Sequence, residues 1–186
     1  MVYLTQLWLP ILLSAVFVFV VSSILHMVLP FHKSDYRKLP DEEKLMDALR
    51  AAGVTPGPVY HFPHCEHKDM NTPAMQEKFK KGPVGFVTVL PSGPVNMGKF
   101  LSLWFVFCLI VAVFTAYVTG RTVAPGTLYL EVFRVAGTVA FMGYGLGHFA
   151  DSVWKGQTWG VTLKHMFDGL IYALLTAGTF GWLWPR

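Results

Sequence analysis

Four long stretches with few or no charged residues dominate the pattern of apolar and polar positions along this chain. Residues 2–25, 100–120 and 169–185 hold no charged side chain, and residues 128–150 hold only two. A helix rises about 1.5 Å per residue, so about 20 apolar residues cross a hydrocarbon core about 30 Å thick. The pattern predicts an all-α integral membrane protein with four transmembrane helices, which we place at residues 1–30, 99–121, 127–151 and 163–185.

The last two predicted helices carry the few charged side chains that approach the membrane. Glu131 and Arg134 lie three residues apart, on one face of a helix, so we expect them to pair with each other. The fourth helix extends back from residue 169 through Phe167 and Met166. That extension places His165 and Asp168 at the membrane edge.

The polar stretch at residues 31–98 carries the start and stop signals of a small folded unit. Pro40 and three acidic residues open one helix, which Gly53 ends, and Pro73 opens a second, which Gly82 ends. Two segments rich in β-branched and aromatic residues predict strands, at residues 59–62 and 84–90. The result is a small α+β cap inserted between the first and second helices. It is small enough that we expect it to dock on the helices or on a partner.

Composition excludes an ordinary soluble domain. The chain is 53% hydrophobic and only 14% charged, so we expect the lipid bilayer to solvate most of it. All 15 lysines and arginines except Arg121, Arg134 and Arg186 fall on the side of the cap once the four helices are threaded. The positive-inside rule then predicts a multi-pass protein of a bacterial inner membrane, with the cap cytoplasmic and both termini outside. The net charge of +4 therefore requires no nucleic-acid partner.

Two matching His-x-x-Asp patterns lie at the cap-side ends of the third and fourth helices. They are His148 with Asp151 and His165 with Asp168, and His26 is expected at a similar depth. Residues three apart share a helix face, and imidazoles with carboxylates suit zinc, iron or manganese. The plainer alternative is a set of polar residues at helix ends. A b-type haem held by two of the histidines is a further alternative.

A second group of possible metal ligands lies in the run His-Phe-Pro-His-Cys-Glu-His within the cap. Its donors are His61, His64, Cys65 and His67, and imidazole with thiolate suits zinc or copper. The spacing lacks paired Cys-x-x-Cys elements, so a polar loop at the membrane surface is the alternative. Cys108 lies within a predicted helix, and a disulfide with Cys65 is not expected.

Small residues recur at helical spacing in the last two predicted helices. Such stripes let helix backbones approach closely in lipid, so these helices should form a tight hairpin. The stripes are Gly169, Ala173, Ala177 and Gly181 in the fourth helix, and Ala136, Ala140, Gly143 and Gly147 in the third.

The motifs favour a binding or structural role over catalysis, because no phosphate-binding glycine loop, nucleophile elbow or paired catalytic carboxylates occur. The first hypothesis is a non-catalytic accessory or structural subunit of a larger membrane assembly, with partner subunits or further copies of itself. The second is a metal- or haem-binding redox membrane protein that uses the His-x-x-Asp pairs. The third is a small oligomeric transporter or proton-conducting protein, with Glu131 and Arg134 as its inner charges.

Overall fold

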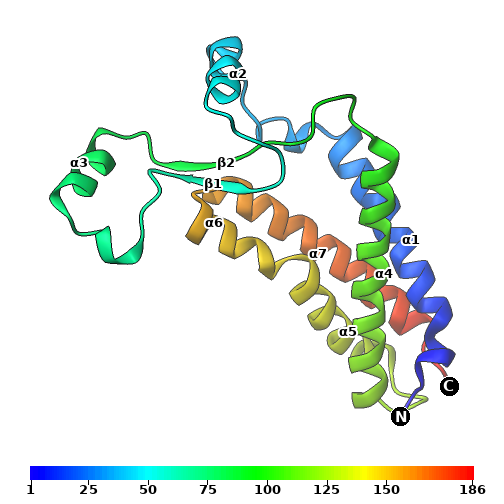
Figure 1. Ribbon diagram of the computed structural model, residues 1–186. Coiled ribbons are helices and arrows are strands. Elements are labelled where there is room, and N and C mark those ends of the chain that lie inside the picture. The colour runs from blue at the N-terminus through cyan, green and yellow to red at the C-terminus, as the bar shows by residue number, and fades with distance from the viewer. The chain divides into compact units, whose positions relative to one another are not determined.

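The computed structural model describes residues 1–186 and is mostly helical, with one two-stranded sheet (Figure 1). The chain divides into two compact units. The helical unit comprises residues 1–36 and 96–186, and the inserted unit comprises residues 37–95.

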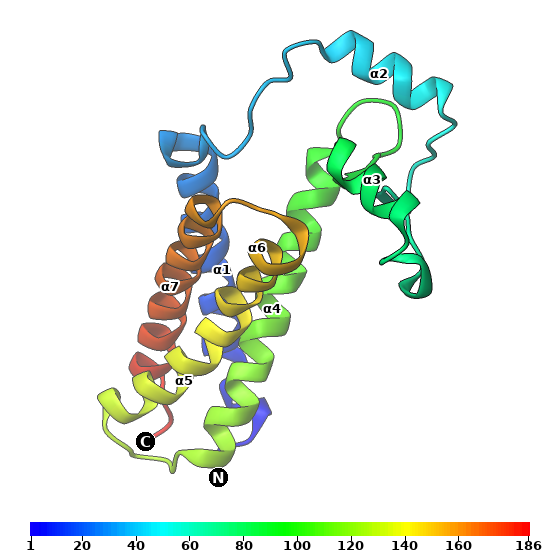
Figure 2. The same cartoon turned by 90° about the vertical axis from the view of Figure 1, so that its left-hand side faces the viewer.

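Four long helices and one short helix build the helical unit. Helix α1 packs against α4 and α7, and α5 also packs against α4 and α7, so the four long helices form a closed bundle (Figure 2). A 3₁₀ turn, Leu4–Leu7, precedes α1, and a π-helical turn, Ile24–Val28, follows it. The helices are α1 (Trp8–Ser23), α4 (Met97–Thr122), α5 (Tyr129–Tyr144), α6 (Phe149–Lys155) and α7 (Trp159–Trp182).

Two helices of this unit are long and apolar enough to cross a membrane. They are the continuous segment Leu4–Val28, with a mean hydropathy of 2.5, and Met97–Thr122, with a mean hydropathy of 2.4. Helices α5 and α7 fall outside this class. Helix α5 has only 16 residues, and α7 carries Lys164 and Asp168 in its first half.

The continuous third helix expected over residues 127–151 is wrong in detail. Helix α5 ends at Tyr144, a 3₁₀ turn follows at Leu146–His148, and α6 begins only at Phe149. Three glycines within five residues explain the break, because each glycine destabilises a helix by about 1 kcal/mol relative to alanine. The expected pair between Glu131 and Arg134 is also absent, since both side chains are exposed and form no ion pair.

The close packing predicted for the last two helices is present between α5 and α7, but the glycines that make it on the α5 side, Gly137 and Gly145, were not in the predicted stripe. A Cβ atom added to Gly169 would lie 2.6 Å from the Cα atom of Gly145, and one added to Gly137 would lie 3.1 Å from the Cβ atom of Ala177. The backbones therefore meet where side chains are smallest. Gly143, by contrast, faces Val111 of α4.

Both termini lie at the same end of the helical unit (Figure 1). The backbone N–H of Val2 donates to the carbonyl of Gly120 at 2.8 Å, and the N–H of Gly126 donates to the carbonyl of Pro185 at 2.9 Å. Trp184 Nε1 also donates to the carbonyl of Ala124 at 2.9 Å. These bonds close one end of the bundle, and the chemistry described below lies at the other.

The inserted unit has the predicted order of helix, strand, helix and strand. Asp41 caps its first helix by accepting from the N–H of Lys44, and Gly53 follows that helix with a φ of +68°, a conformation that favours glycine. The two strands pair antiparallel, with Val59 opposite Thr88. No residue of this unit is buried. Its elements are α2 (Glu42–Ala51), β1 (Val59–Phe62), α3 (Pro73–Lys81) and β2 (Gly85–Thr88).

Candidate metal centre

The polar end of the helical unit is built where α1 stops and α7 starts. Leu29 N–H donates to the carbonyl of Ile24 at 3.1 Å, which closes the π-helical turn that carries His26. Pro30 lacks an N–H and favours an extended residue before it, so the helix cannot continue. A 3₁₀ turn, Pro30–His32, then redirects the chain and brings His32 against α7.

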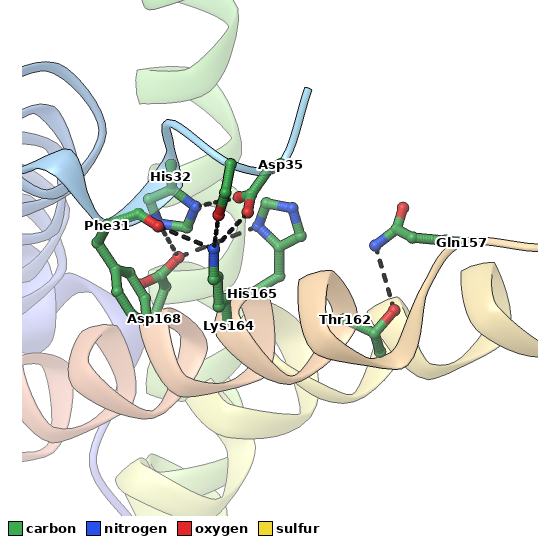
Figure 3. A network of polar contacts seen from close by, with 9 residues as sticks. Phe31, His32, Asp35, Gln157, Thr162, Lys164, His165 and Asp168 are labelled. Carbon is green, nitrogen blue, oxygen red and sulfur yellow. Dashed lines mark hydrogen bonds and ion pairs between the residues drawn. The ribbon is translucent and has the colours of Figure 1, made fainter. Parts of the chain in front are cut away.

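His32 lies between two carboxylates from different parts of the chain (Figure 3). Its Nδ1 atom lies 2.6 Å from Asp35 Oδ2, and its Nε2 atom lies 2.9 Å from Asp168 Oδ2. Only the first contact is aligned as a hydrogen bond. With the Nδ1 proton held by Asp35, the Nε2 lone pair is available to a metal ion that Asp168 would also bind.

Lys164 fastens the segment after α1 to helix α7. Its Nζ atom donates to Asp35 Oδ1 at 2.7 Å, to Ser34 Oγ at 2.8 Å and to the carbonyl of Phe31 at 2.9 Å (Figure 3). Burial raises the pKa of Asp35, but the hydrogen bonds from Lys164 and His32 outweigh burial and hold that pKa below its ordinary value. Asp35 is therefore a fixed carboxylate that orients His32.

Asp168 is the most unusual residue of the site. Its side chain is only 3% exposed. Its closest polar partner is His32 Nε2, 2.9 Å from Oδ2, and no donor is aligned for a hydrogen bond to either carboxylate oxygen. A buried carboxylate without donors costs several kcal/mol unless a cation compensates it. The ligand atoms of His26, His32 and Asp168 all lie within 4.8 Å of one another. These three residues are called the His26–His32–Asp168 group below, and no other group of histidine, cysteine or carboxylate side chains is as close.

His26 belongs to this group and His165 does not. The rings of His26 and His32 are 4.1 Å apart in an edge-to-face contact at 71°. The rings of His32 and His165 are 5.5 Å apart and nearly parallel, at 16°. No nitrogen of His165 lies within 4.8 Å of all three ligand atoms of the group. His165 Nδ1 still lies 4.0 Å from Asp168 Oδ2.

His148 and Asp151, which we predicted as ligands of the same site, lie outside the His26–His32–Asp168 group. The ring of His148 stacks on that of His165 at 5.0 Å, as the matching patterns predict. Its Nδ1 atom lies 3.8 Å from Asp151 Oδ2, but Asp151 already accepts a hydrogen bond from Lys155 at 2.7 Å. The structure thus brings the two His-x-x-Asp patterns side by side without joining all four residues into one ligand set.

The second predicted group of ligands is not assembled in the inserted unit. His61 lies on β1, where its ring stacks on Phe86 at 4.7 Å. His64, Cys65 and His67 follow in the connection to α3, and the Cys65 thiol donates to the carbonyl of Glu66. Both cysteines are free.

Sequence reasoning missed His32, Asp35 and Lys164, although a signal was present. His32 and Asp35 form a third His-x-x-Asp pattern, placed just after Pro30 at the end of the first apolar stretch. Comparisons with protein-family models, curated proteins and solved structures give no match for this chain.

Proposed function

We propose that this protein is a membrane protein that binds a divalent transition metal ion through His26, His32 and Asp168. One observation carries the proposal: Asp168 is buried without an aligned hydrogen-bond donor, and its carboxylate and one nitrogen from each of His26 and His32 lie within 4.8 Å of one another. A bound cation would compensate the charge of Asp168, which two neutral imidazoles do not. The Asp35 carboxylate behind His32 completes the carboxylate–histidine arrangement common around metals.

The donor set identifies the class of metal. Two imidazoles with one carboxylate suit zinc, and also iron or manganese. Ligand atoms bound at about 2.0–2.2 Å to a tetrahedral ion lie roughly 3.4 Å from one another. That spacing falls between the shortest and the longest distances in the group. His32 Nε2 lies 2.9 Å from Asp168 Oδ2, and all ligand atoms lie within 4.8 Å of one another. A haem fits less well, because the rings of His26 and His32 touch and leave no space for a macrocycle between them.

Zinc titration of the metal-stripped protein in detergent tests the proposal. The parent should bind one equivalent, measured by calorimetry and by elemental analysis after gel filtration. His32→Ala and Asp168→Asn should each weaken binding roughly tenfold or more, since even supporting residues around a metal contribute about that much.

Two histidine variants provide matched controls for the zinc titration. His148→Ala removes an imidazole from the same end of the bundle but outside the group, and His61→Ala removes one from the inserted unit. Both should keep the parent affinity. A parent that binds no stoichiometric metal would contradict the proposal, and so would equal losses in all four variants.

We also propose that α5 with α6 and α7 lie in the membrane beside the two apolar helices, so that the chain crosses four times with its cap in the cytoplasm. The closed bundle, the shared end of the two termini and the lysine and arginine asymmetry support this arrangement. The native Cys65 tests it without mutation. An impermeant maleimide should label it in broken cells but not in intact ones, and equal labelling would invert the topology.

A second candidate function is that of a subunit in a larger membrane assembly. Helix α2 is amphipathic, yet its apolar side chains Leu45 and Met46 are 41% and 42% exposed. An unburied apolar face of this kind favours a contact surface for another chain.

Native gel electrophoresis of membrane extracts tests this second candidate. The parent should migrate as an assembly larger than its 20.8 kDa chain, and Leu45→Lys should release the single chain. Glu43→Lys, which changes charge on the same helix without touching the apolar face, should leave the assembly intact. A parent that migrates as a single chain would remove this candidate.

A further inference from the structure

A hollow of about 300 Å³ opens beside the proposed metal ligands. His26, His32 and His165 line it together with Lys33, Asp35 and Tyr36. Asp168, the third ligand, does not line it and lies in the buried interior. An ion held by the three ligands would therefore have Asp168 on its buried side and the hollow on its open side.

The number of ligands is the second element of the argument. Structural zinc sites are closed by four protein ligands, whereas sites that act on exogenous molecules use three and leave a position open. Here the group has three members, and His165 is not one of them. Two of the three ligands, His26 and His32, line the hollow, so an ion held by the group would border it.

The charges around the hollow favour an anionic ligand. Asp35 is offset by Lys164 at 2.7 Å, and Asp168 offsets only one of the two charges of a divalent ion. Lys33 lines the hollow and forms no ion pair with any carboxylate. With the metal bound, the hollow therefore carries a net positive charge, which attracts anions.

We propose that the metal keeps an open coordination position facing this hollow, and that a small anionic group, a phosphate or a carboxylate, binds there beside Lys33. This inference rests on the metal site proposed above and extends it from ion binding to the recognition of an anionic ligand. His165 also lines the hollow.

Cobalt substitution of the full-length protein in lipid-free detergent tests the inference, because the visible absorption of Co²⁺ reports its coordination. Azide and then inorganic phosphate are titrated into the Co²⁺-loaded protein. A saturable spectral change is expected for both. Lys33→Gln should weaken azide binding roughly twofold to fivefold, the size expected for one exposed charge, and should leave Co²⁺ affinity unchanged. Lys99→Gln, another exposed lysine of the helical unit, should change neither.

The outcomes separate the two proposals. If Co²⁺ binds but its spectrum ignores both anions, the coordination shell is closed, so the inference fails while the metal site stands. If Lys33→Gln binds azide like the parent, the assignment of Lys33 fails. If Co²⁺ does not bind, both proposals fail together.

A final arm distinguishes a free anion from a lipid headgroup. Short-chain phosphatidic acid presents the same phosphate group on an acyl anchor, and it is titrated in place of inorganic phosphate. A spectral change at a much lower lipid concentration identifies a membrane headgroup as the ligand, whereas equal or weaker binding identifies a soluble anion. Either result supports an open position, and a response to neither anion overturns it.

Discussion

The helical unit and the inserted unit differ in how their residues are buried. The helical unit contains two clusters of buried side chains, one around Phe180 and one around Val18 and Cys108. The inserted unit, in residues 37–95, buries no side chain. Because stability comes mostly from burial and packing, the two units should respond very differently to the same kind of change.

Their polar contacts differ in the same way. In the inserted unit, Lys80 and Glu77 are three residues apart and each is 72% exposed. In the helical unit, Lys164 reaches Asp35, which lies 129 positions away in the sequence and is 3% exposed. The first kind of pair stabilises a single turn of helix, whereas the second joins separate elements and positions the candidate site.

The largest contrast should come from removing one phenylalanine in each unit. Phe180 is fully buried, and Phe180→Ala should cost about 3–5 kcal/mol in the free energy of unfolding because it leaves a cavity. Phe86 is 48% exposed, and Phe86→Ala should cost less than about 1 kcal/mol. Thermal unfolding in detergent measures both. Equal losses would mean that the inserted unit has a core of its own.

A smaller contrast is expected between two glycines of the same helix, α7. Gly169→Ala would place its Cβ atom 2.6 Å from backbone of α5 at Gly145, and should cost about 1–3 kcal/mol through overpacking. Gly160 has no atom within 4 Å of such a Cβ, so Gly160→Ala should be neutral or stabilise the helix by up to about 1 kcal/mol. Unfolding midpoints that move alike would show that α5 and α7 are not in close contact.

Breaking one ion pair in each unit should change the free energy of unfolding by amounts that differ less. Asp35→Asn leaves Lys164 without its carboxylate partner and should cost about 1–2 kcal/mol, whereas Glu77→Gln in the inserted unit should cost less than about 0.5 kcal/mol. The sign of the pH dependence follows from the lowered pKa of Asp35. Its contribution is present above the unfolded pKa of about 3.9 and is lost as pH falls through the lower folded-state value. Stability measured from pH 7 down to pH 3 in parent and Asp35→Asn checks this, and parallel curves would contradict it.

The two cysteines should differ in reactivity with no effect on stability. Cys65, in the inserted unit, is half-buried, and Cys108, in the helical unit, is fully buried. A thiol reagent should therefore modify one cysteine in the folded protein and two after denaturation. Cys65→Ser should abolish the fast reaction. Two fast-reacting thiols in the folded parent would show that the bundle opens around Cys108.

Local sequence patterns determined the elements of the inserted unit. Asp41, Pro73 and the glycines after each helix act through their immediate neighbours, so the two helices end within a few residues of the predicted positions. The small-residue stripes predicted the contact between α5 and α7 for a similar reason, since close backbone approach depends on side-chain size at regular spacing. The break at Gly145 was harder to predict, because an apolar stretch favours a continuous helix until several glycines outweigh it.

Only the tertiary structure determines which residues come together in the candidate site. The sequence alone indicated His26, His148, His165 and their carboxylates, but spacing cannot say which imidazoles aim at one point. Packing of the turn after α1 against α7 brings His32 to Asp168 and leaves that carboxylate buried without a donor. The same packing holds the ring of His165 nearly parallel to that of His32, and Asp151 forms an ion pair with Lys155. Ring orientation and burial depend on contacts between residues more than 100 positions apart, and a periodic pattern along the chain carries no information about them.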